Sequence, residues 1–474
     1  MTIMRHCRAT GFAILCVLAP LPALAQTATN ITALKGLAPV STLLKTGEGE
    51  AALKANQDVT TGIQVGTLKQ PILLPFAEQQ QLALRDAFIT DGNATELADG
   101  LGSSLAAVYQ ARARYESHKD FSSVSKAVAD LIGYTNNVTK SDSNSGKYFF
   151  ANATKNGKDA VSPEAAAIYS ANGGTADIFG KAYGRPAGST GADAFGNSRP
   201  FQTDPMLVAY RGNDYFGKAS HTIDWLRGPS QNLTDSPSYP SGHTTYGYTE
   251  SLLLAILVPE RYQQMVTRAA EYGNNRIVIG AHYAMDVLGG RATATHALAH
   301  LLANDPAYVG QRRKNPAVIN AMGQTEGEPV VITDYPAALK AAKADLTAFL
   351  TAGCGGPITD CAAKDEGRFK DAAANQAFYD ATQTYGLPVV HKDAAGRAVD
   401  VAKAAPEAGY LLTAAFPSLS LDEANAILTE TLGPGGGFLD DGSAFGLYSR
   451  LNLYAAGGRA AALAASKGSA ASTR

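Results

Sequence analysis

Apolar residues recur at helical spacing along most of this 474-residue chain, and alternating strand patterns are almost absent. The strongest segment, Thr244–Val258, is apolar on nearly every side and stops at Pro259, which cannot continue a helix. This periodicity predicts a mainly α fold. Further helices are predicted over Ala77–Ile89, Thr95–Tyr115, Phe121–Tyr134, Pro163–Ala171, Arg261–Tyr272, Met285–Leu302, Ala337–Leu350, Arg368–Gln383 and Leu421–Leu432.

The first 25 residues have the order of a secretory signal peptide. Arg5 and Arg8 form a short positive stretch, an apolar run follows from Gly11 to Leu21, and Ala25 ends a small-residue cleavage site. The run is too short for a membrane anchor, and prolines interrupt it. We therefore predict a protein secreted across the inner membrane, to the periplasm or the extracellular space. No later stretch is long enough for an integral membrane span.

Composition narrows the class of protein. The chain is 45% hydrophobic and 17% charged, which is too apolar and too weakly charged for a disordered protein. Its 40 basic and 42 acidic side chains nearly balance. A protein that binds nucleic acid or anionic lipid without sequence preference needs a basic excess, so no nucleic-acid partner is expected.

Two cysteines follow the signal peptide, Cys354 and Cys361, with six residues between them. An exported protein reaches an oxidising compartment, so this pair predicts a disulfide that closes a small loop. A zinc site is not expected, because two thiols at this spacing without a nearby pair of histidines do not supply the ligands of zinc.

The segment Ser241-Gly242-His243 directly precedes the apolar helix that begins at Thr244. Backbone N–H groups and the positive end of a helix dipole attract an anion, and Gly242 lets the backbone approach it closely. Ser241 adds a hydroxyl donor, and the guanidinium of Arg276 can bind two oxygens at once. These residues predict a binding site for a phosphate group.

Two histidines and a carboxylate accompany this anion site. His282 and Asp286 are four residues apart, so on a helix both side chains lie on one face. The carboxylate would then hold one ring N–H of His282 and leave the other nitrogen free to attack phosphorus. His243 would donate a proton to the departing oxygen.

The stretches Tyr239–Gly247 and Asn275–Arg291 resemble the type-2 phosphatidic acid phosphatase superfamily. The likeness is closest to its soluble bacterial class A acid phosphatases, and vanadium haloperoxidases share the same site. The family is recognised by three short sequence motifs. These two stretches match two of the motifs, except that Asn275 replaces the usual Ser. The resemblance implies a helical bundle of the acid phosphatase–vanadium haloperoxidase type, with these roles: His282 forms a phosphohistidine, Asp286 orients it, His243 acts as acid and then base, and Arg276, Ser241 and Gly242 bind phosphate.

The family's remaining motif, a Lys followed seven residues later by Arg-Pro, is interrupted. Lys181 is followed by Arg185-Pro186 and, 18 residues on, by Arg199-Pro200. We interpret the motif as split by an 11-residue insertion and assign Lys181 and Arg199, rather than Arg185, to phosphate.

These observations predict a layout of four parts. Residues 1–25 are the signal peptide, 26–74 an extended N-terminal arm, 75–310 the acid phosphatase domain, and 311–474 a helical and loop extension without assigned chemistry. The Ala/Gly/Ser-rich end of that extension, from Ala455 to Arg474, is predicted to be mobile.

The leading functional hypothesis is an exported, metal-independent acid phosphatase that acts on small-molecule phosphate esters and needs no cofactor. The alternative is a vanadium-dependent haloperoxidase, in which the same anion site would hold vanadate and activate peroxide. A third reading, a phosphate-binding protein with an inactive site, is disfavoured because both histidines, Asp286 and Arg276 are all present.

Overall fold

The computed structural model describes residues 26–68, 72–117, 120–189, 193–227, 232–313 and 329–472. The predicted signal peptide, residues 1–25, lies outside the described residues. The rest is mainly helical, as the sequence predicts. Three two-stranded antiparallel pairs complete it: β1 (Tyr115–Ser117) with β2 (Asp120–Phe121), β3 (Arg211–Asn213) with β4 (Ala219–His221), and β5 (Arg312–Arg313) with β6 (Val330–Val331).

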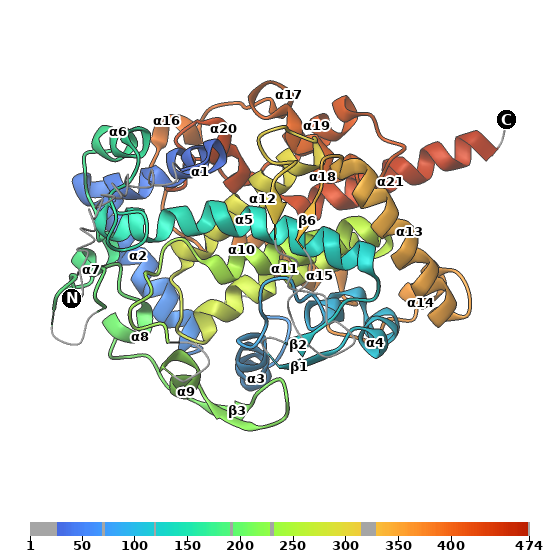
Figure 1. Ribbon diagram of the computed structural model, residues 1–474, viewed down its shortest axis with the longest axis horizontal. Helices are drawn as coiled ribbons and strands as arrows, with labels where there is room; N and C mark the ends of the chain where they lie inside the picture. The colour runs from blue at the N-terminus through green and yellow to red at the C-terminus, as the bar shows by residue number, and fades with distance from the viewer. Residues whose placement is uncertain are drawn as a thin grey trace, which may run out of the picture.

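Four helices form the centre of the molecule. They are α5 (Lys126–Asn152), α10 (Gly242–Leu257), α11 (Tyr262–Val278) and α12 (Ala284–Leu302), and α10 contacts each of the other three. Figure 1 shows α5 crossing the molecule in front of α10 and α12. Every residue of α10 is buried, which agrees with the strongly apolar run in the second half of its sequence.

Helix α5 extends well beyond the predicted end at Tyr134. Beyond Tyr134 it contains a polar run that weakens the apolar periodicity, and side chains of this run form hydrogen bonds with distant parts of the chain. The Asn136 amide donates to Glu250 Oε1 at 2.6 Å, and Asp142 accepts from the Asn30 amide at 3.0 Å. Because these partners lie in other helices, the local pattern does not reveal the full helix.

The prediction of an extended arm over residues 26–74 is wrong, because most of this segment is helical. It forms α1 (Ala28–Leu37), the 3₁₀ segment η1 (Ala38–Lys45) and α2 (Gly47–Gln64). Thr27 and Thr46 cap the two α-helices through their hydroxyl groups. Buried leucines such as Leu34 and Leu53 supply the packing that weak sequence periodicity did not indicate.

The C-terminal extension packs against the central helices and shares their hydrophobic core. Arg368 binds Glu271 of α11 and, at 2.7 Å, Asp99. Arg291 of α12 donates to the Tyr379 hydroxyl at 2.9 Å. The extension comprises α13 (Tyr335–Cys354), α14 (Ile358–Ala362), α15 (Ala372–Thr384), α16 (Lys392–Ala395), α17 (Val401–Ala404), η4 (Pro406–Gly409), α18 (Tyr410–Thr413), α19 (Leu421–Glu430), α20 (Ala444–Leu447), η5 (Tyr448–Arg450) and α21 (Leu453–Ser472).

Two predictions concern this extension directly. The Cys354–Cys361 disulfide is present, with a Cα–Cα distance of 6.1 Å. The tail predicted to be mobile is helix α21, and its first half is packed, with Ala456 and Ala460 buried. An alanine-rich sequence favours helix once one face finds a partner, here α11 and α19.

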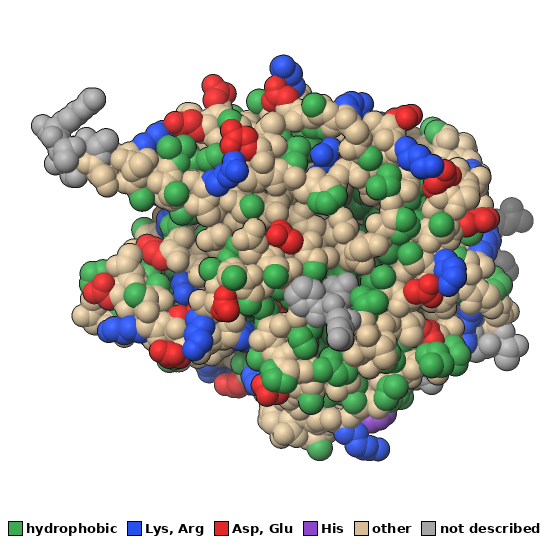
Figure 2. Space-filling model, turned by 180° about the vertical axis from the view of Figure 1, so that it is seen from behind, with side chains coloured by type: hydrophobic (Ala, Val, Ile, Leu, Met, Phe, Trp, Pro, Cys, Tyr) green, Lys and Arg blue, Asp and Glu red, His purple; other side chains and the backbone are tan. Residues whose placement is uncertain are grey.

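The remaining elements are short. Among the described residues, no helix combines the length and the apolar character needed to cross a bilayer. On the face of the molecule opposite to that in Figure 1, positive and negative side chains are interspersed (Figure 2).

The other helices are α3 (Phe76–Asp86), η2 (Leu97–Leu101), α4 (Ser103–Arg112), α6 (Pro163–Ala171), α7 (Ile178–Ala182), α8 (Pro200–Thr203), α9 (Thr222–Arg227) and η3 (Pro259–Arg261).

Candidate active site

The residues of the two intact motifs meet where α10 and α12 begin and α11 ends. Ser241 is the N-cap of α10, Arg276 lies in the last turn of α11, and Asp286 lies in the first turn of α12. Gly290 allows these elements to approach, because a Cβ there would lie 2.5 Å from the Ser241 carbonyl oxygen. The Ser241 N–H in turn donates to the Asp286 carbonyl at 3.0 Å. Close helix packing therefore brings the two motifs together.

His282 is held through both ring nitrogens. Its Nδ1 lies 3.2 Å from Asp286 Oδ2, and its Nε2 lies 3.1 Å from Arg199 Nη1. A guanidinium can only donate, so Nε2 is assigned as the acceptor and Nδ1 as the nitrogen that carries hydrogen. The expected pairing on one helix face is corrected: His282 precedes α12, and the contact forms across the start of that helix.

Asp286 is completely buried and accepts several hydrogen bonds. Its Oδ2 accepts from the Tyr283 N–H at 2.8 Å and from the Ser238 hydroxyl. Burial raises the pKa of Asp286 to about 7, against the lowering effect of these hydrogen bonds and of Arg199. Ser238 was missed by the sequence analysis, since no spacing rule connects it with a carboxylate 48 residues later.

His243 faces the other histidine across the site. The centroids of the His243 and His282 rings are 5.7 Å apart. Burial, followed by the positive charge of Arg276, holds the pKa of His243 well below its usual range. Burial and then Arg199 do the same to the pKa of His282. An anion bound here would oppose both effects.

Two arginines line the site, and both are completely buried. Arg199 donates to the carbonyl oxygens of Ser236 at 2.7 Å and Ala281 at 3.0 Å, as well as to His282. Arg276 lies with its guanidinium carbon 5.8 Å from the centre of the Tyr272 ring. Carbonyl contacts hold the Arg199 side chain rigidly beside the His282 ring.

Ser241 and Gly242 lie at the start of α10. The Ser241 hydroxyl oxygen caps α10 by accepting from the Thr244 N–H at 3.1 Å, and it also accepts from the Thr244 hydroxyl at 2.9 Å. Its own hydrogen is then directed elsewhere, since an oxygen with two acceptor contacts retains one donor. Gly242 is the first residue of α10, where backbone N–H groups lack helical partners.

Asn275, which departs from the family pattern, has a structural explanation. Its amide nitrogen donates to Asp86 at 2.7 Å, and its amide oxygen accepts from Gln79 at 2.6 Å. Both partners belong to α3, so Asn275 points away from the two histidines and fastens α11 to its neighbour.

The structure separates Lys181 from this constellation. Lys181 is exposed on the five-residue helix α7, and its ammonium donates to the Ala176 carbonyl at 2.8 Å. Arg185 is also elsewhere, with its guanidinium on the Gln202 carbonyl at 2.6 Å. Of the two candidate arginines, Arg199 is the one that contacts His282. The assignment of Lys181 to phosphate is therefore corrected, because the short helix turns its side chain outward.

A basic side chain that the sequence analysis did not consider lies beside the site instead. Lys147 of α5 is half-buried, and its charge acts on the pKa of both histidines and of Asp286. Lys147 belongs to none of the sequence motifs, and it lies in the part of α5 that was not predicted to be helical.

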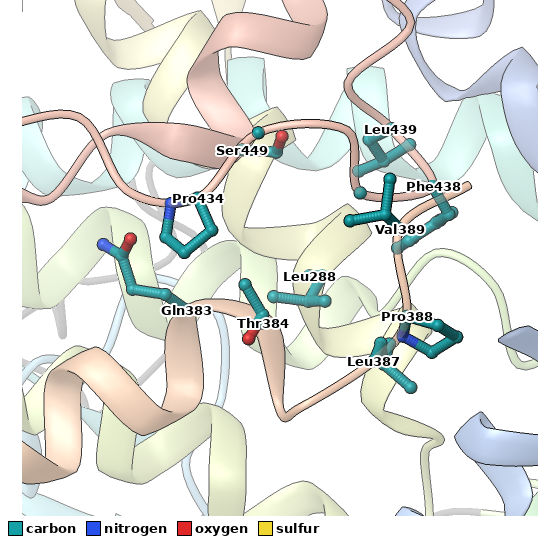
Figure 3. Close-up of a pocket in the computed structure, with 12 residues that line it drawn as sticks. Leu288, Gln383, Thr384, Leu387, Pro388, Val389, Pro434, Phe438, Leu439 and Ser449 are labelled. Carbon is teal, nitrogen blue, oxygen red and sulfur yellow. The ribbon is translucent and has the colours of Figure 1, made fainter. Parts of the chain in front are cut away.

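A separate cavity of about 120 Å³ lies where α12 meets the C-terminal extension. Figure 3 shows Leu288 of α12 beneath side chains of that extension, among them Gln383, Pro434 and Phe438. It contains neither histidine of the site. This cavity lies at the interface between the central helices and the C-terminal extension.

Comparison with known proteins supports the family resemblance for part of the chain. Residues 188–307 match the PAP2 superfamily, so a domain of that superfamily is present and the resemblance inferred from the motifs is confirmed there. The match includes Arg199, both histidines, Arg276 and Asp286. It begins after Lys181 and α5, and it is narrower than the domain predicted over residues 75–310.

Three bacterial relatives are named as phosphatases. A non-specific acid phosphatase from Providencia stuartii is 29% identical over 156 residues, which is 30% of this chain and 60% of the relative. A non-specific acid phosphatase from Salmonella typhimurium is 46% identical over 59 residues, 12% of this chain and 24% of the relative. An acid phosphatase from Zymomonas mobilis is 41% identical over 71 residues, 15% of this chain and 27% of the relative. The alignments thus span from a quarter to three fifths of the relatives.

Proposed function

We propose that this protein is an exported acid phosphatase that hydrolyses phosphomonoesters through a phosphohistidine on His282. The observation that carries the proposal is the state of the His282 ring. Asp286 Oδ2 lies 3.2 Å from Nδ1, which carries the ring hydrogen. Nε2 is unprotonated and accepts from Arg199 at 3.1 Å. An oriented imidazole beside cationic donors is suited to attack an anionic phosphorus centre.

The reaction proceeds in two steps. A phosphomonoester dianion binds between Arg199, Arg276 and the N–H groups at the start of α10. Nε2 of His282 attacks phosphorus, the bond from phosphorus to the leaving oxygen breaks, and His243 gives its proton to that oxygen. Water then attacks the phosphohistidine, His243 takes the water proton, and inorganic phosphate leaves from Nε2. Asp286 acts here in its ionised form: the positive charge that develops on the neighbouring ring lowers the pKa of Asp286 from its raised resting value, and the carboxylate stabilises that charge in return.

The bacterial relatives and the predicted signal peptide favour an exported phosphatase over the alternatives. The relatives are named as acid phosphatases, which favours ester hydrolysis over the haloperoxidase reaction. Residues 1–25 have the order of a signal peptide, so we propose a periplasmic or extracellular location. We also propose that the reaction needs no metal, because side chains supply the nucleophile, the acid and the anion-binding groups.

The direct test is hydrolysis of p-nitrophenyl phosphate by the purified mature chain with a chelator present. We expect turnover to persist in the chelator, and we expect no halide oxidation after addition of vanadate and peroxide. Absence of ester hydrolysis together with vanadate-dependent halide oxidation would establish the haloperoxidase reading instead.

The pH profile follows from the two lowered histidine pKa values. His282 must be neutral and His243 protonated when the ester bond breaks. Because burial and Arg276 lower the pKa of His243, its proton is lost at a lower pH than from an ordinary histidine near ~6.5. The alkaline limb of kcat/KM should therefore lie in the acid range. Bound phosphate opposes the positive field, so the alkaline limb of kcat should lie at higher pH.

The measurement is a pair of pH–rate profiles for the wild type and His243→Ala. The variant should lose the alkaline limb and should slow esters of poor leaving alcohols more than nitrophenyl esters. If good and poor leaving groups are slowed equally, His243 does not act as the acid.

Arg199 should contribute far more to turnover than Arg185. Removing a charged donor to a transferring phosphoryl group costs about 10²–10³ in rate, so Arg199→Ala should lose that much in kcat/KM. Arg185→Ala should stay within a few-fold of the wild type, since its guanidinium binds the Gln202 carbonyl instead. The Arg199→Lys variant keeps the positive charge but lacks the paired guanidinium donors, so it tests the role of those donors. Thermal unfolding of each variant excludes a folding defect. The reverse ranking in steady-state kinetics would place Arg185 in the site.

A further inference from the structure

Helix α5 presents a polar face beside the candidate site. Lys140, Asn144 and Lys147 follow one another at spacings of four and three residues, so they lie along one side of the helix. This helix contacts both α10 and α12, the two helices that carry His243 and Asp286. None of the three lies within residues 188–307, which match the PAP2 superfamily.

The end of the Lys147 side chain lies against the start of α10. A Cβ placed on Gly242 would be 3.4 Å from Lys147 Cε and 3.5 Å from its Nζ, with Asn144 Oδ1 at 3.8 Å. The Lys147 ammonium therefore lies close to Gly242, in the first turn of α10, where backbone N–H groups lack helical partners. An anion bound at this helix start would be stabilised by those N–H groups and by the ammonium.

The two lysines on this face differ in their partners. Lys140 is paired with Asp91, with Nζ 2.7 Å from Oδ2. Lys147 has no carboxylate within salt-bridge distance in the described part of the chain, and the nearby charge of Arg199 is also positive. Desolvation and then that repulsion lower the pKa of Lys147 to about 7. The charge of Asp286 opposes this lowering of the pKa, but the net effect disfavours the charged form of Lys147, and a bound anion would favour it.

We propose that Lys147 is a phosphate-binding residue of the active site, whose ammonium contacts an oxygen of the transferred phosphoryl group. It supplies from α5 the lysine that the sequence analysis assigned to Lys181. Together with Arg199 and Arg276 it gives the site three cationic groups from three separate parts of the chain. This inference rests on the proposed function, since it assumes that the anion bound there is a phosphate.

The test compares Lys147→Met with three further variants of the mature chain. Lys126→Met is the matched control, because Lys126 is an exposed lysine of the same helix paired with Asp130. Lys181→Met tests the rival assignment, and Lys147→Arg tests rescue by another cation. The readouts are kcat and KM for p-nitrophenyl phosphate, inhibition by inorganic phosphate, and thermal unfolding.

We expect Lys147→Met to lower kcat/KM about 10²-fold and to raise the inhibition constant of phosphate about tenfold or more, with Lys147→Arg recovering part of both. Lys126→Met and Lys181→Met should match the wild type. A folded Lys147→Met protein within threefold of the wild type in both readouts would overturn the inference. So would a Lys181→Met protein that loses phosphate affinity while Lys147→Met keeps it.

Calorimetric titration of inorganic phosphate into His282→Ala separates this inference from the proposed function, because binding there needs no turnover. If Lys147→Met weakens phosphate binding on that background, Lys147 is an anion-binding residue even when the wild type hydrolyses no ester. Unchanged phosphate binding on that background would refute the role of Lys147 and leave the hydrolytic reaction intact.

Discussion

His282→Ala is expected to lower kcat by on the order of 10⁶ and to abolish the phosphoenzyme, because the residue supplies the attacking nitrogen. The wild-type ring is already oriented for this role, with Nδ1 held by Asp286 and Nε2 beside Arg199. An alanine leaves Arg199 and Arg276 in place, so phosphate should still bind while the bond to phosphorus cannot form. Rapid quenching under alkaline conditions, followed by mass spectrometry, would detect the acid-labile phosphohistidine in the wild type alone.

The control is His221→Asn, which alters a half-buried histidine of β4. It should retain both turnover and the trapped phosphoenzyme. Persistence of an acid-labile phosphoenzyme in His282→Ala would exclude His282 as the nucleophile. A full loss of activity in His221→Asn would instead point to a general sensitivity of the fold.

Asp286→Asn should have the second-largest effect, about 10⁴ in kcat, which is the scale found when an orienting carboxylate is replaced by its amide. The amide oxygen can still accept from the Ser238 hydroxyl, the Tyr283 N–H and His282 Nδ1, so the fold should persist. What disappears is the negative charge that stabilises the phosphorylated ring. Single-turnover kinetics should show a phosphoenzyme that forms slowly, and Ser238→Ala should lose far less. An Asp286→Asn protein within tenfold of the wild type would remove the orienting role.

Much of the site follows from local sequence. The order Ser241-Gly242-His243 before an apolar run predicts a helix start with exposed N–H groups, and the structure begins α10 at Gly242 with Ser241 as its cap. The spacing of His282 and Asp286 predicts their contact, although the structure forms it at a helix start rather than along a helix face. The helix predicted at Pro163–Ala171 has the same bounds in the structure.

Other features depend on side chains that meet only after the chain has folded. The part of α5 beyond Tyr134 was not predicted to be helical, and its polar side chains find partners such as Glu250 only in the folded protein. The N-terminal helices α1 and α2 were not predicted because their stability comes from packing. Thr60 and Asn56 of α2 even accept the backbone N–H groups of Ala284 and Met285 at the start of α12.

By itself, the sequence determined the mainly α class, the disulfide pair, and the histidines, arginine and carboxylate of the two intact motifs. These are relations between neighbours, and backbone geometry converts a spacing of three or four residues into a contact. The tertiary structure decided which basic residues complete the site. Arg199 reaches His282 across 83 residues of chain, Lys147 arrives on a different helix, and Lys181 turns outward despite its place in the motif. The packing of α5 against α10 and α12 sets those distances, and no local spacing contains that information.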